Sequence, residues 1–211
     1  CNSQNNSKDY EKWLKIKRKT IKTTYNIFDF DKSQVLRKKF NNKKIIFGII
    51  ARLAPEKNLF YLLKIFKEIK SKNIYLKILG KGYLLNRLKK YTHKVKINDK
   101  VSFLSETNNV KNFISKLDVF ILTSYMEGIP NVLLEAQNQS LPIFSTRVGG
   151  IDECVVENYT CTFISKNSPK LASKKILNTI KDKKFFEKKD FDKIKFKLNK
   201  FQSKNVLKTI E

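Results

Sequence analysis

The segment SYMEGIPNVLLE, residues 124–135, carries two carboxylates eight positions apart around a predicted turn. Gly128 and Pro130 favour a tight turn at a strand end, followed by the start of a helix. A helix N-terminus offers free N–H groups and a partial positive charge, which suit a phosphate. Glu127 and Glu135 can accept hydrogen bonds from vicinal hydroxyls. The segment therefore predicts a site for a phosphate joined to a sugar or ribose.

The spacing of the two glutamates is not specific by itself. Ten glutamates in 211 residues give about 0.5 such pairs by chance. Glu135 could instead act only as a favourable charge in the first turn of its helix. The hypothesis therefore depends on the strand–turn–helix context and on a second site.

The second site is the pair Arg52 and Lys57, which follows an apolar run directly. Two cations five positions apart could clamp a diphosphate, because arginine offers a fork of donors and lysine a point charge. The chain contains 40 lysines but only 5 arginines. Arg52 is therefore the more informative of the two residues.

Strands and helices must alternate to position these residues. Apolar, β-rich runs predict strands at 45–51, 74–79, 101–104, 119–123, 142–146 and 161–165. Helical periodicity predicts helices near 58–71, 83–95, 108–116, 131–139, 151–157 and 169–181. This alternation predicts an α/β fold, a Rossmann-like parallel sheet with helices on both faces. Ligands of such sheets bind beyond the carboxyl ends of the strands, where both candidate sites would lie.

The two ends of the chain do not follow this alternation. Residues 8–20 predict a short helix and residues 21–28 a strand-like segment. Residues 184–211 are rich in lysine and phenylalanine and predict one or two amphipathic helices.

Metal and disulfide chemistry are not indicated. The three cysteines have unrelated spacings and the chain has a single histidine, so neither a disulfide framework nor a multi-histidine metal site is expected. About 0.4 Asp-x-Asp triplets are expected by chance, and the chain has two, at 29–31 and 190–192. Both are flanked by lysine, and neither follows a convincing strand. We interpret both as noise.

The net charge of +26 is compatible with a nucleic-acid-binding module or with contact with an anionic membrane. However, 40 lysines and 20 asparagines against 5 arginines indicate A/T-rich codon bias, whereas nucleic-acid readers rely on arginine. Residues 118–165 also contain six acidic residues and only one basic residue. We therefore expect no specific nucleic-acid partner and at most a modest attraction to anionic lipid.

Four motifs together carry a family resemblance: ARLAPEKN (51–58), GKG (80–82), EGIPNVLLEA (127–136) and RVGGIDE (147–153). They resemble the carboxyl-terminal, donor-binding domain of GT-B retaining glycosyltransferase family 4, the glycosyl transferases group 1. The resemblance covers residues 43–181. The sequence departs from the family pattern at Ala51, where glycine is usual, and at Asn138 and Ser140, where alanine and glycine are common.

The resemblance also implies roles for individual residues. Arg52 and Lys57 would neutralise the leaving nucleoside diphosphate, and Glu127 would face the transferred sugar, so these three form the expected catalytic set. Glu135 would hold the ribose hydroxyls. The backbone of the turn would contact phosphate and sugar through Gly128, Ile129, Pro130 and Asn131. No metal and no other cofactor would be required.

Three parts of the chain follow from the same resemblance. Residues 1–30 would be the end of an N-terminal domain and the interdomain segment, and residues 31–183 the nucleotide-sugar-binding Rossmann-like domain. Residues 184–211 would be a helical tail that packs back on the N-terminal domain. The chain does not begin with Met, and we expect that domain, which would carry the acceptor pocket, to precede residue 1.

The expected function is transfer of a sugar, with retention, from a nucleotide sugar to a glycan or lipid-linked acceptor in surface polysaccharide or glycolipid synthesis. The expected location is cytoplasmic, with peripheral contact at the inner face of the cytoplasmic membrane. The chain alone would be inactive. The alternatives are a basic nucleic-acid-binding module and a catalytically inactive relative that binds nucleotide sugars.

Overall fold

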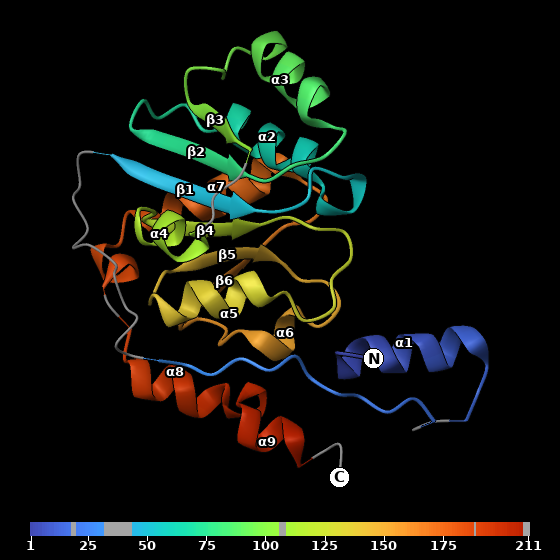
Figure 1. Cartoon of the computed structure of the whole chain (residues 1–211). Helices are drawn as coiled ribbons and strands as arrows, with labels where there is room; N and C mark the ends of the chain where they lie inside the picture. The colour runs from blue at the N-terminus through green and yellow to red at the C-terminus, as the bar shows by residue number, and fades with distance from the viewer. Residues whose placement is uncertain (18–19, 32–43, 106–108, 188, 209–211) are drawn as a thin grey trace.

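The computed structural model describes residues 1–17, 20–31, 44–105, 109–187 and 189–208. Residues 32–43 and 106–108 of the predicted Rossmann-like domain and residues 209–211 of the predicted tail lie outside this description. The described strands are β1 (Ile45–Ile50), β2 (Ile74–Leu79), β3 (Val101–Leu104), β4 (Val119–Leu122), β5 (Ile143–Thr146) and β6 (Cys161–Ile164). They form one parallel sheet in the order β3-β2-β1-β4-β5-β6 (Figure 1).

The predicted α/β fold is confirmed. The helices that alternate with the strands are α2 (Leu59–Glu68), α3 (Leu85–Lys94), α4 (Val110–Ser115), α5 (Asn131–Asn138) and α6 (Ile151–Cys154), and α7 (Pro169–Ile180) follows β6. Helices α2 and α7 contact each other behind the sheet in Figure 1, and α4 and α5 contact each other in front of it. The strand order reverses between β1 and β4, which is the point where such sheets bind ligands.

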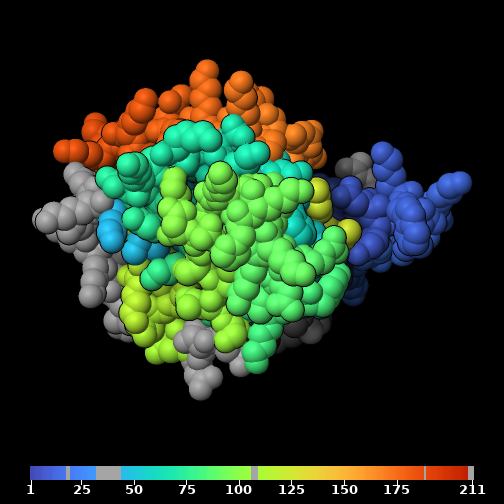
Figure 2. All heavy atoms as spheres, turned by 90° about the horizontal axis from the view of Figure 1, so that it is seen from above, coloured from blue at the N-terminus to red at the C-terminus, as the bar shows by residue number. Residues whose placement is uncertain are grey.

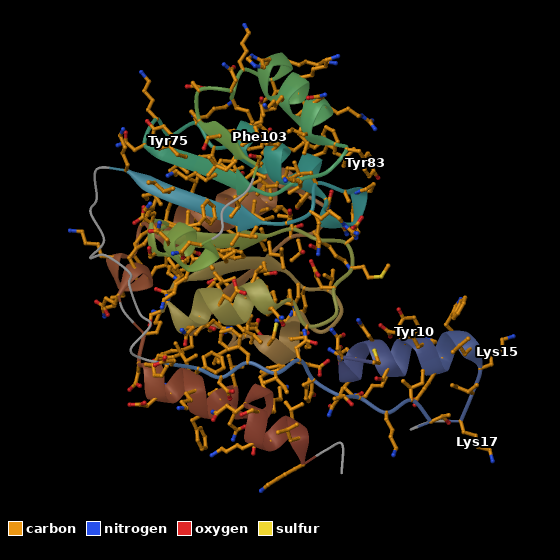
Figure 3. All side chains as sticks on the ribbon, in the orientation of Figure 1. Tyr10, Lys15, Lys17, Tyr75, Tyr83 and Phe103 are labelled. Carbon is orange, nitrogen blue, oxygen red and sulfur yellow. The ribbon has the colours of Figure 1, made fainter. Side chains whose placement is uncertain are left out.

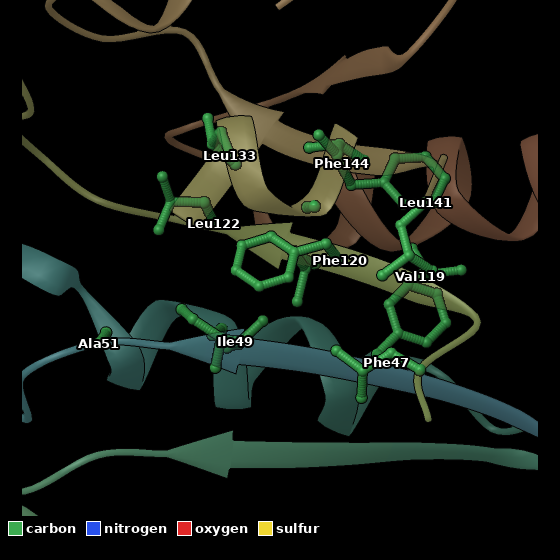
Figure 4. Packing of buried hydrophobic residues seen from close by; sticks show 14 of the residues in the cluster. Phe47, Ile49, Ala51, Val119, Phe120, Leu122, Leu133, Leu141 and Phe144 are labelled. Atoms are coloured by element: carbon green, nitrogen blue, oxygen red, sulfur yellow. The ribbon is translucent and has the colours of Figure 1, made fainter. Parts of the chain in front are cut away.

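The core lies between the sheet and these helices. Phe47 on β1 is fully buried and contacts Phe66 on α2 and Phe144 on β5, at ring-centroid distances of 5.5 and 6.1 Å. Figure 4 shows the Phe47 side chain beside Val119, its partner on β4. The residues of β4 and β5 are all buried, as expected for strands covered on both faces. This packing fixes the strand ends that carry the candidate site.

The amino-terminal prediction is partly wrong. Helix α1 spans Gln4–Leu14 rather than 8–20, because Ser3 caps its start and Lys15 adopts a left-handed conformation at its end. Residues 21–28 form no strand. Their backbone makes isolated hydrogen bonds instead, including those from the Thr24 N–H to the Cys1 carbonyl (2.8 Å) and from the Phe28 N–H to the Phe201 carbonyl (2.7 Å).

The carboxyl-terminal tail is helical, as predicted. Its elements are η3 (Lys183–Phe186), α8 (Phe191–Lys197), η4 (Asn199–Phe201) and α9 (Ser203–Leu207). Residues 20–31 run between this tail and helices α5 and α6 (Figure 1). Phe201 is fully buried and its ring lies 5.1 Å from that of Tyr25. The described tail thus packs on this chain, and its packing on a preceding domain stays a prediction.

Helix α1 projects sideways from the sheet domain (Figures 1 and 2). No helix in the described part of the chain is both long enough and apolar enough to cross a membrane.

Candidate nucleotide-sugar site

A cavity of about 540 Å³ opens at the carboxyl ends of β1, β2 and β4. Its lining includes Arg52, Lys57, Gly80, Lys81, Glu127, Pro130 and Asn131. The structure therefore brings together five of the predicted site residues from two loops that are about 70 positions apart in the sequence. The location agrees with the edge where parallel sheets of this kind bind ligands.

The GKG motif shapes the floor of this cavity by allowing two loops to approach closely. Gly80 has φ +149°, and a Cβ there would lie 1.9 Å from the backbone oxygen of Ala51. The Leu53 N–H donates to the Lys81 carbonyl at 2.7 Å. Only glycine permits this approach, and it holds the backbone that leads to Arg52 in place.

Arg52 follows β1 and reaches solvent, with 74% of its side chain exposed. Its Nη2 lies 2.6 Å from Oε1 of Glu56, at the start of the short helix η2 (Pro55–Lys57). The pKa of Glu56 is lowered because its carboxylate accepts a hydrogen bond from its own backbone N–H and another from Arg52. The sequence reasoning missed this partner, although the i,i+4 spacing of Arg52 and Glu56 was a usable signal.

Lys57 is held more firmly. Its Nζ lies 2.7 Å from Oε1 of Glu127, and the exposed fractions of the two side chains are 21% and 9%. Ser124 Oγ donates to the same carboxylate oxygen at 2.5 Å. Both predicted cations therefore have carboxylate partners, and a diphosphate would have to replace or share them.

The turn before α5 contributes residues both to the cavity and to contacts with the amino-terminal segment. Pro130 and Asn131 line the cavity, whereas Gly128 and Ile129 are absent from its described lining. Ile129 is buried, and its carbonyl accepts a hydrogen bond from Nδ2 of Asn26 at 3.0 Å. Asn26 Nδ2 also lies 2.7 Å from Oδ1 of Asn131. No local sequence pattern indicates this contact.

Glu135 lies one turn into α5 and lines a neighbouring cavity of about 200 Å³. Val110 lines both cavities, so the two are adjacent. The Oε2 atom of Glu135 is buried and makes no hydrogen bond within the described structure. Burial raises the pKa of this carboxyl group. An unsatisfied buried oxygen is costly, and a hydroxyl donor from a ligand would satisfy it.

No group of three or more His, Cys, Asp or Glu side chains that could hold a metal occurs among residues 1–17, 20–31, 44–105, 109–187 and 189–208. All three cysteines are free; Cys154 and Cys161 are buried. Burial raises the pKa of each of these two thiols. These two are thus core residues, not reactive groups.

The fold is shared with glycosyltransferase structures. Anabaena HepE, solved in complex with UDP, superimposes with a TM-score of 0.83 over all of this chain and 61% of its own, at 16% identity. Staphylococcus aureus TarM, solved with UDP and alpha-GlcNAc-glycerol, gives a TM-score of 0.82 over 97% of this chain and 41% of its own, at 17% identity.

Sequence comparison identifies relatives that are longer than this chain. An uncharacterized glycosyltransferase of Methanocaldococcus jannaschii is 31% identical over 68% of the chain and 38% of its own length. An Escherichia coli UDP-Gal:alpha-D-GlcNAc-diphosphoundecaprenol alpha-1,3-galactosyltransferase is 33% identical over 60% of the chain and 33% of its own length. The chain thus spans between one third and two fifths of the length of these relatives.

The family model described as "Glycosyl transferases group 1" matches residues 31–197, which is most of the chain and includes every predicted site residue. The match agrees with the parallel sheet and with the clustering of Arg52, Lys57 and Glu127 at its carboxyl edge. The chain belongs to the glycosyl transferases group 1 family.

Proposed function

We propose that this chain is the nucleotide-sugar-binding half of a retaining glycosyltransferase of family 4. The observation that supports this function is the convergence of Arg52, Lys57 and Glu127 in one cavity beside the N-terminus of α5. Two cations and a helix N-terminus suit a diphosphate, and a carboxylate suits sugar hydroxyls.

Each group has a role in the proposed reaction. The bond between the anomeric carbon and the diphosphate oxygen breaks as the acceptor oxygen bonds to that carbon. Negative charge then builds on the leaving diphosphate, and Arg52 and Lys57 stabilise it. Glu127 faces the transferred sugar. No metal is needed, because the two protein cations serve this purpose.

The rest of the site binds the donor. The backbone of the turn at residues 128–131 contacts the phosphate and the sugar. Glu135 accepts from the ribose hydroxyls, which would satisfy its buried Oε2 atom. The donor is a nucleoside-diphosphate sugar, a proposal supported by the UDP bound to HepE and TarM.

The acceptor is a glycan or lipid-linked sugar that binds to a preceding domain. The E. coli relative, named for a GlcNAc-diphosphoundecaprenol acceptor, and a Staphylococcus aureus relative, capsular polysaccharide biosynthesis glycosyltransferase CapM, support a role in surface polysaccharide synthesis. We place this activity in the cytoplasm, at the inner face of the membrane, where the basic surface gives a modest attraction to anionic lipid.

Calorimetric titration of the chain with UDP, GDP and ADP tests the donor site. We expect weak binding of one nucleotide, and a loss of binding in the variant that combines Arg52→Ala with Glu135→Ala. Binding of that variant with unchanged affinity would refute the assigned site. Transfer of labelled sugar by the longer protein then distinguishes an active enzyme from an inactive relative.

Filter binding of the chain to DNA and RNA at physiological salt tests the nucleic-acid alternative. Non-specific charge contacts weaken steeply as salt is raised, so we expect little retention. Tight, salt-resistant binding would favour the nucleic-acid-binding alternative.

A further inference from the structure

Glu153 on α6 accepts four hydrogen bonds, all from the amino-terminal segment. Its Oε1 accepts from Ser3 Oγ at 2.8 Å and from the Asn5 N–H at 2.9 Å. Its Oε2 accepts from the Gln4 N–H at 3.0 Å and from Tyr25 Oη at 2.8 Å. One carboxylate therefore joins the first turn of α1 to the extended segment at residues 20–31.

The carboxylate is ionised when it makes these bonds. Burial, the largest single influence, raises the pKa of Glu153, but its hydrogen bonds to Asn5, Ser3, Tyr25 and Gln4 together outweigh it, so the pKa lies below the ordinary value of 4.5. Hydrogen bonds to an ionised acceptor are about twice as strong as neutral ones. The four hydrogen bonds to Glu153 are therefore a strong part of this attachment.

The amino-terminal segment also binds the turn that precedes α5. Asn6 Nδ2 donates to the Glu127 carbonyl at 2.9 Å, and Asn26 Nδ2 donates to the Ile129 carbonyl at 3.0 Å. A Cβ on Gly128 would lie 2.3 Å from the side-chain oxygen of Asn2. The amino-terminal segment thus packs against each residue of the turn from 127 to 129.

These contacts fix the orientation of the peptide that follows Glu127. Its carbonyl is held by Asn6 and also accepts from the Gly150 N–H at 3.3 Å. In a trans peptide the next N–H points the opposite way, so the contact with Asn6 also sets the direction of the Gly128 N–H. Glu127 is the residue whose side chain holds Lys57.

Beyond its first turn, helix α1 forms hydrogen bonds with the extended segment: Ser7 Oγ lies 2.6 Å from Thr23 Oγ1, and the Ile21 N–H donates to Oε1 of Glu11 at 2.9 Å. The first turn itself also contacts the sheet domain through Asn5 Nδ2, which donates to the Gly149 carbonyl at 3.1 Å.

Helix α1 projects from the sheet domain (Figures 1 and 2), and Tyr10 and Lys15 lie along its outer part (Figure 3). Tyr10 and Trp13 are 47% and 76% exposed. The position of Asn6 therefore depends on the first turn of α1, where Glu153 binds.

We propose that Glu153 is a positioning residue for the donor site: it holds the first turn of α1 so that Asn6 and Asn26 fix the turn at residues 127–131. The shape of the turn that meets the donor thus depends on the amino-terminal segment. What this turn binds rests on the proposed function; the coupling between Glu153 and the turn does not.

Glu153→Gln tests this coupling, because glutamine keeps the shape but loses the charge and one acceptor. Asp152→Asn is the matched control: it removes one charge from the same helix, and Asp152 is exposed and pairs with Arg147 at 3.1 Å. Hydrogen exchange of ligand-free protein is measured at residues 3–8 and at 127–131. We expect the exchange rate at both sites to rise about tenfold in Glu153→Gln. In the control, the exchange rate should change at neither site.

Faster exchange at 3–8 with unchanged exchange at 127–131 would overturn the proposal, because Glu153 would then only anchor α1. If Glu153→Gln does not fold, Asn6→Ala replaces it. This variant keeps the Glu153 contacts, and we expect faster exchange at 127–131 alone. Unchanged exchange there would also overturn the proposal.

Affinity gives a readout that general destabilisation would not produce. UDP-glucose, GDP-mannose and ADP-glucose are compared with the matching nucleoside diphosphates. We expect Glu153→Gln to weaken binding of the sugar nucleotide by about tenfold and of the diphosphate by less, because the turn meets the sugar. Equal losses would overturn the positioning role. If the wild type binds none of these nucleotides, the proposed function fails, and the exchange results alone decide the coupling.

Discussion

The pair formed by Lys57 and Glu127 allows a test of both stability and site geometry. The two side chains lie 2.7 Å apart, and Glu127 is buried. Lys57→Met keeps the length and apolar stem of the side chain but removes its charge. Among the residues that the structure describes, the carboxylate then keeps only the hydrogen bond from Ser124.

Removing one partner of a buried ion pair typically destabilises a protein by about 3–5 kcal/mol. Lys57 is about one-fifth exposed, and the Ser124 hydroxyl still solvates the carboxylate, so we expect about 2 kcal/mol. At about 2–4 °C per kcal/mol for a chain of this size, Tm should fall by about 4–8 °C.

The assay is thermal and urea unfolding followed by circular dichroism. Lys64→Met, at an exposed position on α2, is the control and should change Tm little. The double variant with Glu127→Gln should recover stability, with a coupling energy of at least about 1 kcal/mol. A coupling energy below about 0.5 kcal/mol would refute the inference that the two charges stabilise each other.

Further predictions concern the other site residues. Arg52→Ala should lower nucleoside diphosphate affinity by about tenfold and stability by less than about 0.5 kcal/mol; Arg87→Ala is the calorimetric control and should change neither. Because burial raises the folded-state pKa of Glu135 above 4.5, the folded protein binds more protons above that pH, and its stability falls as pH rises. Glu135→Gln should therefore unfold at a higher Tm than wild type at pH 8 but not at pH 4. Gly149→Ala should destabilise the fold by at least about 2 kcal/mol in urea, because Gly149 has φ +53° and its Cβ would lie 1.9 Å from the Glu127 carbonyl oxygen. Glu127→Gln should bind nucleoside diphosphate about threefold or more tightly by calorimetry, because Lys57 is released from its partner; weaker binding would contradict this.

The sheet could be predicted from the sequence because its strands are covered on both faces. Such strands appear as short apolar runs, and all six lie where they were expected, within one residue at each end. Residues 21–28 show why the same reasoning fails elsewhere. An extended segment with apolar residues resembles a strand in sequence. A strand, however, also needs a neighbouring strand with which its backbone forms a regular ladder of hydrogen bonds. Here the partners of the backbone are isolated groups on Cys1 and Phe201, which no local pattern reveals.

The sequence predicted which loops form the candidate site, but not how their side chains pair. Arg52, Lys57 and Glu127 were placed at one edge because parallel strands end there. The pair of Lys57 with Glu127 was not predicted, because pairing across about 70 positions depends on side-chain reach in the folded protein. The pair of Arg52 with Glu56 is local, and its i,i+4 spacing could have indicated it. Glu135 follows Asn131 by four positions, so it lies on the same face of α5 but about 6 Å further along the axis. This displacement puts it in the neighbouring cavity.

The ion pairs also decide how the site can respond to a ligand. Arg52 is largely exposed, and its pair with Glu56 is a surface pair that solvent screens, so Arg52 can turn to a diphosphate at little cost. Lys57 must leave a buried carboxylate, so its transfer to a phosphate costs more and leaves Glu127 unpaired. A sugar hydroxyl beside Glu127 would offset that cost, whereas a nucleotide alone would not. Under the proposed function, the pairing would therefore favour complete occupation by a nucleotide sugar, and it would link the proposed Lys57 contact with phosphate to the proposed Glu127 contact with sugar.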